Sequence, residues 1–79
     1  MNIREARIRD VAAIAGLIPE SAAITEDKVM GMIAKKDPKI YVAADFSANI
    51  HACALGADKI YVSPNCMEEG VLDALAKMY

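Results

Sequence analysis

The spacing of apolar residues changes along the chain, and each change predicts a different element. Residues 3–8 alternate weakly between apolar and charged side chains, which is typical of a short strand. After Asp10 the apolar residues recur every three or four positions, which predicts an amphipathic helix that Pro19 closes. The apolar side of this helix contains Val11, Ile14, Ala15, Leu17 and Ile18.

A second helix is predicted after a linker at residues 20–24. Thr25 is a suitable N-cap, since its hydroxyl can accept a hydrogen bond from a free backbone N–H of the first turn. The charges agree with the helix dipole, because acidic residues occupy the first turn and basic residues the last. These residues are Glu26, Asp27, Lys35 and Lys36, and a turn at Asp37-Pro38 follows.

Three strands come next, separated by short turns. Residues 40–44, 50–55 and 59–63 are rich in β-branched, aromatic and other apolar side chains. The connections at residues 45–49 and 56–58 are short, so we expect each strand to pair antiparallel with the one before it.

The last strand runs directly into a helix. Pro64 ends the strand, and Asn65 with Glu68 three residues later matches a capping box, which predicts a helix that starts after Asn65. The apolar positions of this helix recur at helical spacing, and they are Met67, Val71, Ala74, Leu75 and Met78.

The order is therefore strand, helix, helix, three strands, helix. It predicts a single α+β domain over residues 1–79, with a mainly antiparallel sheet packed by helices. Another small α+β fold, such as a ferredoxin-like variant, remains open. At 79 residues the chain is near the size at which one hydrophobic core is only marginally sufficient.

Composition narrows the function classes. A hydrophobic fraction of 56% indicates a globular chain, and a net charge of −2 without a basic stripe argues against nucleic-acid binding. No membrane-spanning run or secretory signal is found, and we expect a reducing, cytoplasmic setting in which Cys53 and Cys66 form no disulfide. His51 and these cysteines lack the paired spacing of a zinc site, so no metal ligand is assigned.

The turn between the last strand and the last helix is the candidate site, because free N–H groups at a helix N-terminus can bind an anion. Residues 62–75 resemble the coenzyme A loop of the GNAT acetyltransferase superfamily. There, a strand ends in a hydrophobic residue, often with a proline, and an Arg/Gln-x-x-Gly-x-Gly/Ala pattern cradles the pyrophosphate. Val62, Pro64, Gly70 and Val71 fall where that pattern places them. The resemblance implies acetyl-CoA as cofactor, with Val62, Gly70 and Val71 as its binding residues.

The loop departs from the family pattern in its charges. Met67 and Glu68 stand where the family usually has a basic or amide residue and a glycine, and Leu72 replaces the last small residue. A pyrophosphate needs close backbone approach and positive potential, whereas Glu68 and Glu69 supply negative charge. We therefore expect weak or absent coenzyme A binding.

The resemblance also implies that the chain corresponds to the N-terminal half of such a domain. Residues 3–10 resemble the usual start of GNAT domains, and Tyr79 ends the chain before the family's fifth strand and its tyrosine general acid. No catalytic residue is assigned. Tyr41 and Tyr61 are interpreted as packing residues of strands, and Asp45 and Asp58 as solvated turn residues.

Three functions remain as hypotheses. The first is a degenerate, weakly active or inactive GNAT-like domain, and the second is a minimal acetyl-CoA-dependent N-acetyltransferase for a small amine. The third is a non-catalytic interaction or regulatory module that associates through the edge of the fourth strand. That edge, with Ile60, Tyr61 and Val62, could pair in a homodimer or with a partner chain completing the sheet, although Lys59 opposes pairing.

Overall fold

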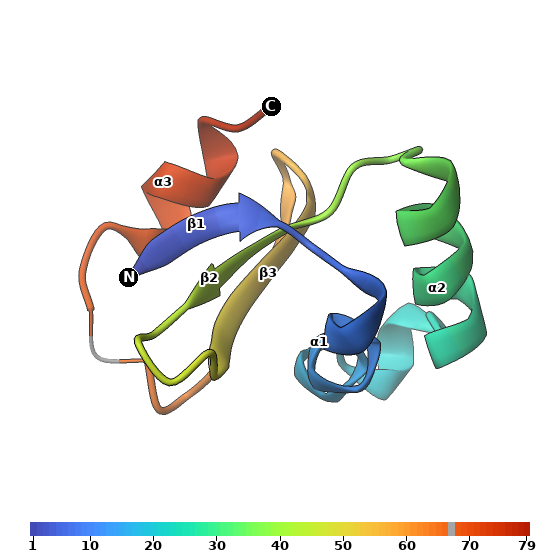
Figure 1. Cartoon of the computed structure of the whole chain (residues 1–79), viewed down its shortest axis with the longest axis horizontal. Coiled ribbons are helices and arrows are strands. Elements are labelled where there is room, and N and C mark those ends of the chain that lie inside the picture. Colours follow the sequence, from blue (N-terminus) through green and yellow to red (C-terminus); the bar gives the residue numbers. More distant parts are fainter. Residues whose placement is uncertain (67) are drawn as a thin grey trace.

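The computed structural model describes residues 1–66 and 68–79 and confirms the α+β class (Figure 1). Its elements follow the expected order of one strand, two helices, three strands and a last helix. In chain order they are β1 (Asn2–Glu5), α1 (Val11–Leu17), α2 (Glu26–Lys35), β2 (Tyr41–Ala44), β3 (Ile50–Gly56), β4 (Lys59–Val62) and α3 (Val71–Ala76), with short 3-10 turns at Ile8–Asp10 and Glu20–Ala22.

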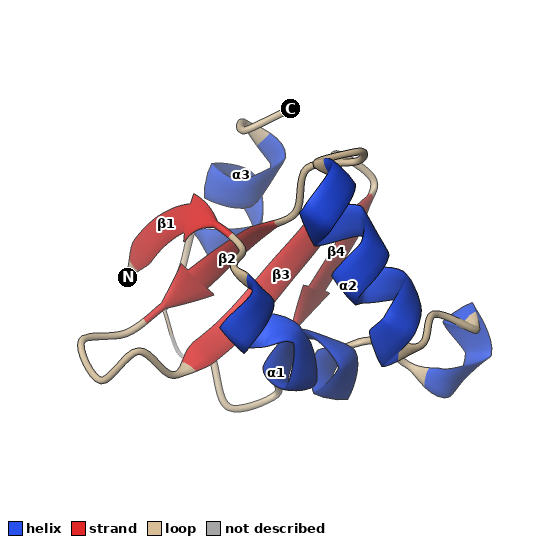
Figure 2. Ribbon diagram, turned by 45° about the vertical axis from the view of Figure 1, so that its right-hand side comes forward, coloured by secondary structure: helices blue, strands red, loops and turns tan. Residues whose placement is uncertain are grey.

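The four strands form one antiparallel sheet in the order β1-β2-β3-β4 (Figure 2). The pairing of β2, β3 and β4 follows the prediction from their short connections, and β1 pairs with β2 although two helices separate them in the sequence. The register pairs Ile3 with Ala43, Val42 with Cys53, and Cys53 with Tyr61. Among the described strands, β1 and β4 each pair on one side, so they form the two edges of the sheet.

Helices cover both faces of the sheet, and each face has its own core. The α1 and α2 helices pack on one face, and α3 packs on the other (Figure 1). The core under α1 and α2 has large side chains, namely Val11, Ile14, Ile18, Val29, Ile40, Val42 and Leu55, together with Ala6 and Cys53. The core under α3 is built on alanines, namely Ala43, Ala52 and Ala54, covered by Val71 and Leu75.

An ion pair fixes the chain where β1 leads into α1. Asp10 is the buried charged residue of the described chain, at 6% exposure, and it precedes α1 as the sequence predicted. Its carboxylate accepts hydrogen bonds of 2.7 and 3.1 Å from the Arg4 guanidinium and one of 2.8 Å from the Arg7 backbone N–H. The hydrogen bond from Arg4 is the main reason that the pKa of Asp10 is lowered.

The boundaries of α2 follow from local chemistry and match the prediction. The Thr25 hydroxyl accepts a hydrogen bond of 3.3 Å from the Lys28 backbone N–H, so it caps the helix. At the other end Lys36 adopts a left-handed conformation and terminates the helix before the Asp37-Pro38 turn. The side chain of Val29 is fully buried, while Met32 and Ile33 are partly buried against the same core.

Candidate functional site

The connection from β4 to α3 is bonded back onto the end of the sheet. Ser63 donates its backbone N–H to the His51 carbonyl at 2.8 Å, which extends the β3–β4 ladder by one residue. The Ser63 carbonyl then accepts from the Cys66 N–H at 3.0 Å, and the Ser63 hydroxyl accepts from the Asn65 N–H at 3.2 Å. These bonds place residues 63–66 in a turn that belongs to the strand.

The predicted capping role of Asn65 is wrong. The turn at Ser63 engages the Asn65 N–H, and α3 begins only at Val71, with Gly70 as its N-cap at φ 83°. Glycine adopts this left-handed conformation without the penalty that a Cβ would bring. Of the predicted apolar stripe, Val71 and Leu75 are buried and Met78 is 44% exposed, while the predicted place of Met67 lies outside the described residues.

The three residues expected to bind the cofactor are only partly brought together. Gly70 and Val71 line a small hollow of about 110 Å³ with Met1, Ile3, Glu68, Glu69 and Ala74. Val62 is not among these lining residues; it lies on β4 and is 41% exposed. The sequence thus located two neighbouring residues of one hollow, but not a continuous cradle.

The charges of this loop are acidic. The Glu68 carboxylate contacts the Met1 amino group at 2.8 and 2.9 Å, and Glu69 is exposed beside it. The α3 helix has six residues, so its dipole is short and offers little compensating positive potential. The Met1 amino group offsets part of the Glu68 charge, so Glu69 contributes most to the poor electrostatic conditions that the loop provides for a pyrophosphate.

A larger hollow of about 560 Å³ lies next to Glu68, between the start of β1 and the β2–β3 connection. Its lining combines apolar side chains with two carboxylates and consists of Met1, Asn2, Ala44, Asp45, Phe46 and Glu68. The side chain of Phe46 is fully exposed at the connection. This hollow was not predicted, because its residues come from three distant segments.

Asp45, expected to be a solvated turn residue, organises the β2–β3 connection. Its carboxylate accepts hydrogen bonds of 2.9 Å from the backbone N–H groups of both Ser47 and Asn49, and it lies 2.8 Å from His51 Nε2. His51 is the extra residue of a β-bulge, since Ala43 pairs with Ala52 and Ala44 with Ile50.

The Asp45–His51 contact decides what this pair can do chemically. The hydrogen bond from His51 is the main reason that the pKa of Asp45 falls to about 2, so the carboxylate is ionised at neutral pH. An ionised carboxylate only accepts, hence Nε2 of His51 carries the proton in this contact. A carboxylate with so low a pKa is a weak base. We therefore interpret the pair as a structural contact that stabilises the β2–β3 hairpin.

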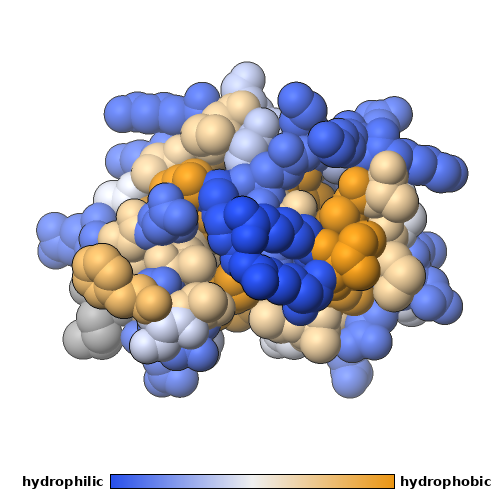
Figure 3. Space-filling view, viewed as in Figure 1, coloured by the Kyte–Doolittle hydropathy of each residue, from blue (hydrophilic) through white to orange (hydrophobic). Residues whose placement is uncertain are grey.

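A third hollow, of about 460 Å³, lies beside the connection from β1 to α1. Its lining is Arg4, Glu5, Ala6, Arg7, Ile8, Ile33 and Lys36. Figure 3 shows strongly hydrophilic side chains over this connection, with a hydrophobic patch next to them. Arg4 is already paired with Asp10, so the remaining charges of the lining are Arg7, Lys36 and Glu5, and the groove is weakly positive.

The side chains of Cys53 and Tyr79 have structural roles and are not reactive groups of a site. Burial raises the pKa of the Cys53 thiol to about 12, so this cysteine is a packing residue and not a nucleophile. The hydroxyl of Tyr79 lies 2.7 Å from the Lys39 carbonyl and 2.6 Å from the Ala54 carbonyl, and its ring packs edge-on against Tyr41 at 5.4 Å. The predicted packing roles of Tyr41 and Tyr61 are confirmed, since each packs partly buried against a core.

Among residues 1–66 and 68–79, no group of three His, Cys, Asp or Glu side chains could hold a metal ion. No helix within these residues has the length and apolar character needed to cross a membrane.

Comparisons with protein-family models, with curated proteins and with solved structures give no match. The fold and the site therefore indicate only the structural class of the protein. Over residues 1–66 and 68–79 it is a small α+β domain with a four-stranded antiparallel sheet, three helices and an acidic turn between its last strand and last helix.

Proposed function

We propose that this chain is a degenerate GNAT-like domain that binds coenzyme A weakly or not at all and acts as an interaction module. The order of its elements and the positions of Pro64, Gly70 and Val71 support the family scaffold. Weak cofactor binding is inferred mainly from two carboxylates, those of Glu68 and Glu69, which directly precede Gly70. Both line the hollow in which a pyrophosphate would have to lie.

The size of the repulsion between a carboxylate and a phosphate supports weak coenzyme A binding. A carboxylate about 4 Å from a phosphate oxygen costs about 1 kcal/mol in bulk water and more near a protein surface, which is a loss of affinity of about fivefold or more for a glutamate whose charge is not offset. The short α3 helix recovers only a fraction of that energy through its dipole. Moreover, Glu68 is already held by the Met1 amino group, so it would have to give up this contact to move away.

A titration with acetyl-CoA tests the proposal through amide chemical shifts. We expect the amides of residues 62–72 to stay unchanged at millimolar cofactor. Movement of these amides at sub-millimolar cofactor would instead favour the second candidate, a minimal acetyl-CoA-dependent N-acetyltransferase. The position of Gly70 and Val71 in one hollow is the observation that supports that candidate.

A matched set of variants separates charge from shape. Replacing both glutamates, Glu68→Gln and Glu69→Gln, keeps side-chain size and removes the repulsion. If the loop has kept the shape of a cofactor cradle, the double variant should bind acetyl-CoA about tenfold or more tightly than the parent chain. Glu26→Gln, on the exposed first turn of α2, is the control and should change nothing. Equal affinities for all three proteins would show that the loop is not a cradle.

A further inference from the structure

The outer edge of β4 presents a definite set of backbone groups. In an antiparallel ladder, successive residues turn their N–H and C=O groups alternately toward and away from the neighbouring strand. Ser63 donates to His51, and Tyr61 pairs with Cys53 in the same register, so these two residues face β3. Ile60 and Val62 therefore direct their backbone groups outward, where none of the described residues pairs with them.

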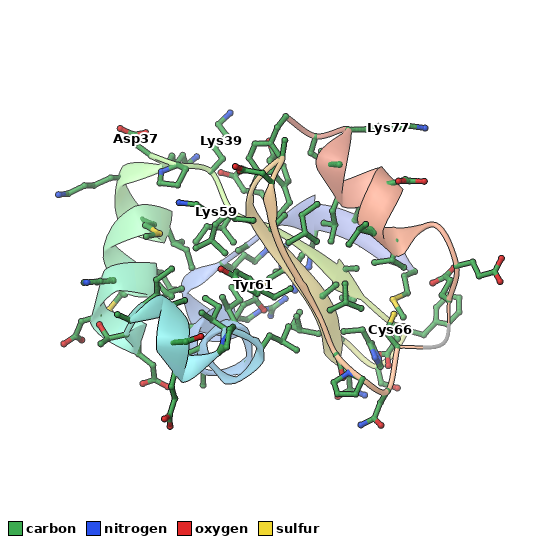
Figure 4. All side chains as sticks on the ribbon, turned by 180° about the vertical axis from the view of Figure 1, so that it is seen from behind. Asp37, Lys39, Lys59, Tyr61, Cys66 and Lys77 are labelled. Atoms are coloured by element: carbon green, nitrogen blue, oxygen red, sulfur yellow. The ribbon has the colours of Figure 1, made fainter. Side chains whose placement is uncertain are left out.

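The side chains of β4 are apolar on both faces of the sheet. Ile60 packs against the core under α3, and Tyr61 packs against the core under α1 and α2. Val62 is 41% exposed and follows Ile60 on the α3 side, because side chains alternate along a strand. Figure 4 shows Lys59 and Tyr61 projecting together from β4 toward the side of the sheet that α2 covers.

We infer that β4 pairs antiparallel with β4 of a second copy of this chain, about a two-fold axis at Tyr61. Ile60 of one copy then lies opposite Val62 of the other, and each such pair exchanges two hydrogen bonds. The two symmetric pairs make four hydrogen bonds and engage every outward backbone group of these residues. They also join four apolar side chains on the α3 side, which is the kind of cross-strand contact that stabilises sheets.

Neighbouring registers are less favourable. An axis at Ile60 places the charged Asp58 opposite Val62 in the new ladder. An axis at Val62 places Ile60 opposite Pro64, which has no N–H to donate. The position of Pro64 two residues after Val62 thus favours the register centred on Tyr61 over these alternatives.

The edge lysine does not prevent this pairing. With the axis at Tyr61, Lys59 lies opposite Ser63, and the two Lys59 residues are four strand positions apart, or about 14 Å. That distance exceeds the Debye length of about 8 Å at physiological salt, so their repulsion is largely screened. This register therefore reduces the contribution of lysine–lysine repulsion to the protection that an edge lysine gives.

The α3 helix is compatible with a continuous sheet of eight strands. It contacts β2, β3 and β4, and its contacts with β3 are the most numerous. The two β3 strands would be three strand spacings apart, about 14 Å, whereas a helix with its side chains is about 10–12 Å wide. The two α3 helices can therefore lie side by side on the same face.

Sedimentation equilibrium over a micromolar to millimolar concentration range tests the inference on the intact chain. We expect the mass to rise from 8.5 kDa toward about twice that value, as a reversible dimer requires. Hydrogen exchange should then locate the interface, because the amides of Ile60 and Val62 would become protected as the concentration rises. An isotope-filtered NOE between the Tyr61 α-protons of labelled and unlabelled copies would identify the register.

Two lysine substitutions provide the matched variants. Val62→Lys places a charge in the apolar cross-strand contact and should weaken dimerisation about tenfold or more. Leu72→Lys, on the exposed side of α3, adds the same charge and removes a similar apolar side chain, and it should leave the dimer within about twofold. Circular dichroism of each monomer checks that both variants remain folded.

This inference rests on the proposed interaction role, but its test is separate from the cofactor titration. A clean monomer at the highest concentration would overturn self-pairing, as would a dimer in which the Ile60 and Val62 amides exchange freely. Protection of these amides only after addition of a different polypeptide would also overturn it, by assigning the edge to another partner. In each of these cases the result for acetyl-CoA stands unchanged.

Discussion

At the scale of single residues, polar side chains determine the backbone conformation at positions where the pattern of apolar residues makes no prediction. Asp45 is the main example, because it accepts hydrogen bonds from Ser47, Asn49 and His51 and so closes the β2–β3 connection. The sequence predicted only that Asp45 lies at a turn. The bulge that brings His51 to it depends on the pairing of β2 with β3, and no local pattern specifies such an offset.

The Asp45–His51 contact predicts how the hairpin responds to pH. The pKa of Asp45 falls from 3.8 to about 2 in the fold, so the carboxylate stabilises the native state above about pH 4 and this contribution is lost as the pH falls toward 2. His51→Ala removes the main cause, and we expect the pKa of Asp45 to rise toward its ordinary value. Side-chain carboxyl ¹³C shifts recorded between pH 1 and 6 would measure it.

Ser47→Ala is the control for this titration. Ser47 donates through its backbone N–H, which alanine also has, so the pKa of Asp45 should not change. If His51→Ala left the titration midpoint near pH 2, the backbone donors and not the imidazole would be holding the carboxylate ionised.

At the scale of elements, the sequence predicted the middle of the chain well and its last connection poorly. The bounds of β2, β3 and β4 differ from the predicted ranges by about one residue, because runs of apolar residues between short turns have few other solutions. The start of α3 was misplaced by several residues. Asn65 and Glu68 match a local capping motif, but the bonds at Ser63 keep residues 63–66 with the strand, and that competition is tertiary.

Contacts between distant segments also determine which residues line the candidate site. Gly70 and Val71 line one hollow, which follows from their being neighbours in the chain, and their predicted role in cofactor binding stays a prediction. The contributions of Met1 and Ile3 to that hollow could not be predicted, since they depend on β1 lying beside α3. The larger hollow at Phe46 was missed for the same reason.

Two glycine substitutions test the structural role of the α3 N-cap. Gly70 has φ 83° and no atom within 4 Å of an added Cβ, so Gly70→Ala introduces backbone strain without a steric clash. We expect it to lower the free energy of unfolding by about 1 kcal/mol. Gly16→Ala, within α1 and also in open space, should raise it by about 0.5 to 1 kcal/mol.

Urea unfolding followed by circular dichroism would measure both glycine variants. The two substitutions are chemically identical, so a difference in sign isolates the backbone conformation as the cause. A stabilising effect at both positions would mean that Gly70 does not hold the left-handed conformation in solution.

At the scale of the whole molecule, a single residue joins the segment after α3 to the sheet. Tyr79 follows α3, yet its hydroxyl lies against carbonyls of Lys39, before β2, and of Ala54, in β3. Desolvation is the main reason that its pKa rises to about 12, so the neutral phenol is the form that the fold favours. This stabilisation is complete below about pH 10 and is lost as the pH rises through 12.

Tyr79→Phe should lower the free energy of unfolding by about 1 to 2 kcal/mol, because it removes the hydroxyl that these carbonyls share and keeps the ring packing on Tyr41. Urea unfolding at neutral pH would measure the loss. Tyr61→Phe is the control, since the Tyr61 hydroxyl makes no hydrogen bond within the described part of the chain, and its effect should stay within about 0.5 kcal/mol. Equal losses in both variants would rule out a special role for the terminal hydroxyl.

The small side chains beneath α3 affect how easily this helix detaches from the sheet in the native state. Two large side chains, Val71 and Leu75, attach this helix to Ala43, Ala52 and Ala54. Lifting the helix away would uncover about two buried aliphatic side chains, roughly 4 kcal/mol, in addition to any loss of the Tyr79 contacts that follow it, while the core on the opposite face stayed intact. The helix can therefore open as a separate unit below the threshold of global unfolding, and its amides would exchange before those of β2 and β3.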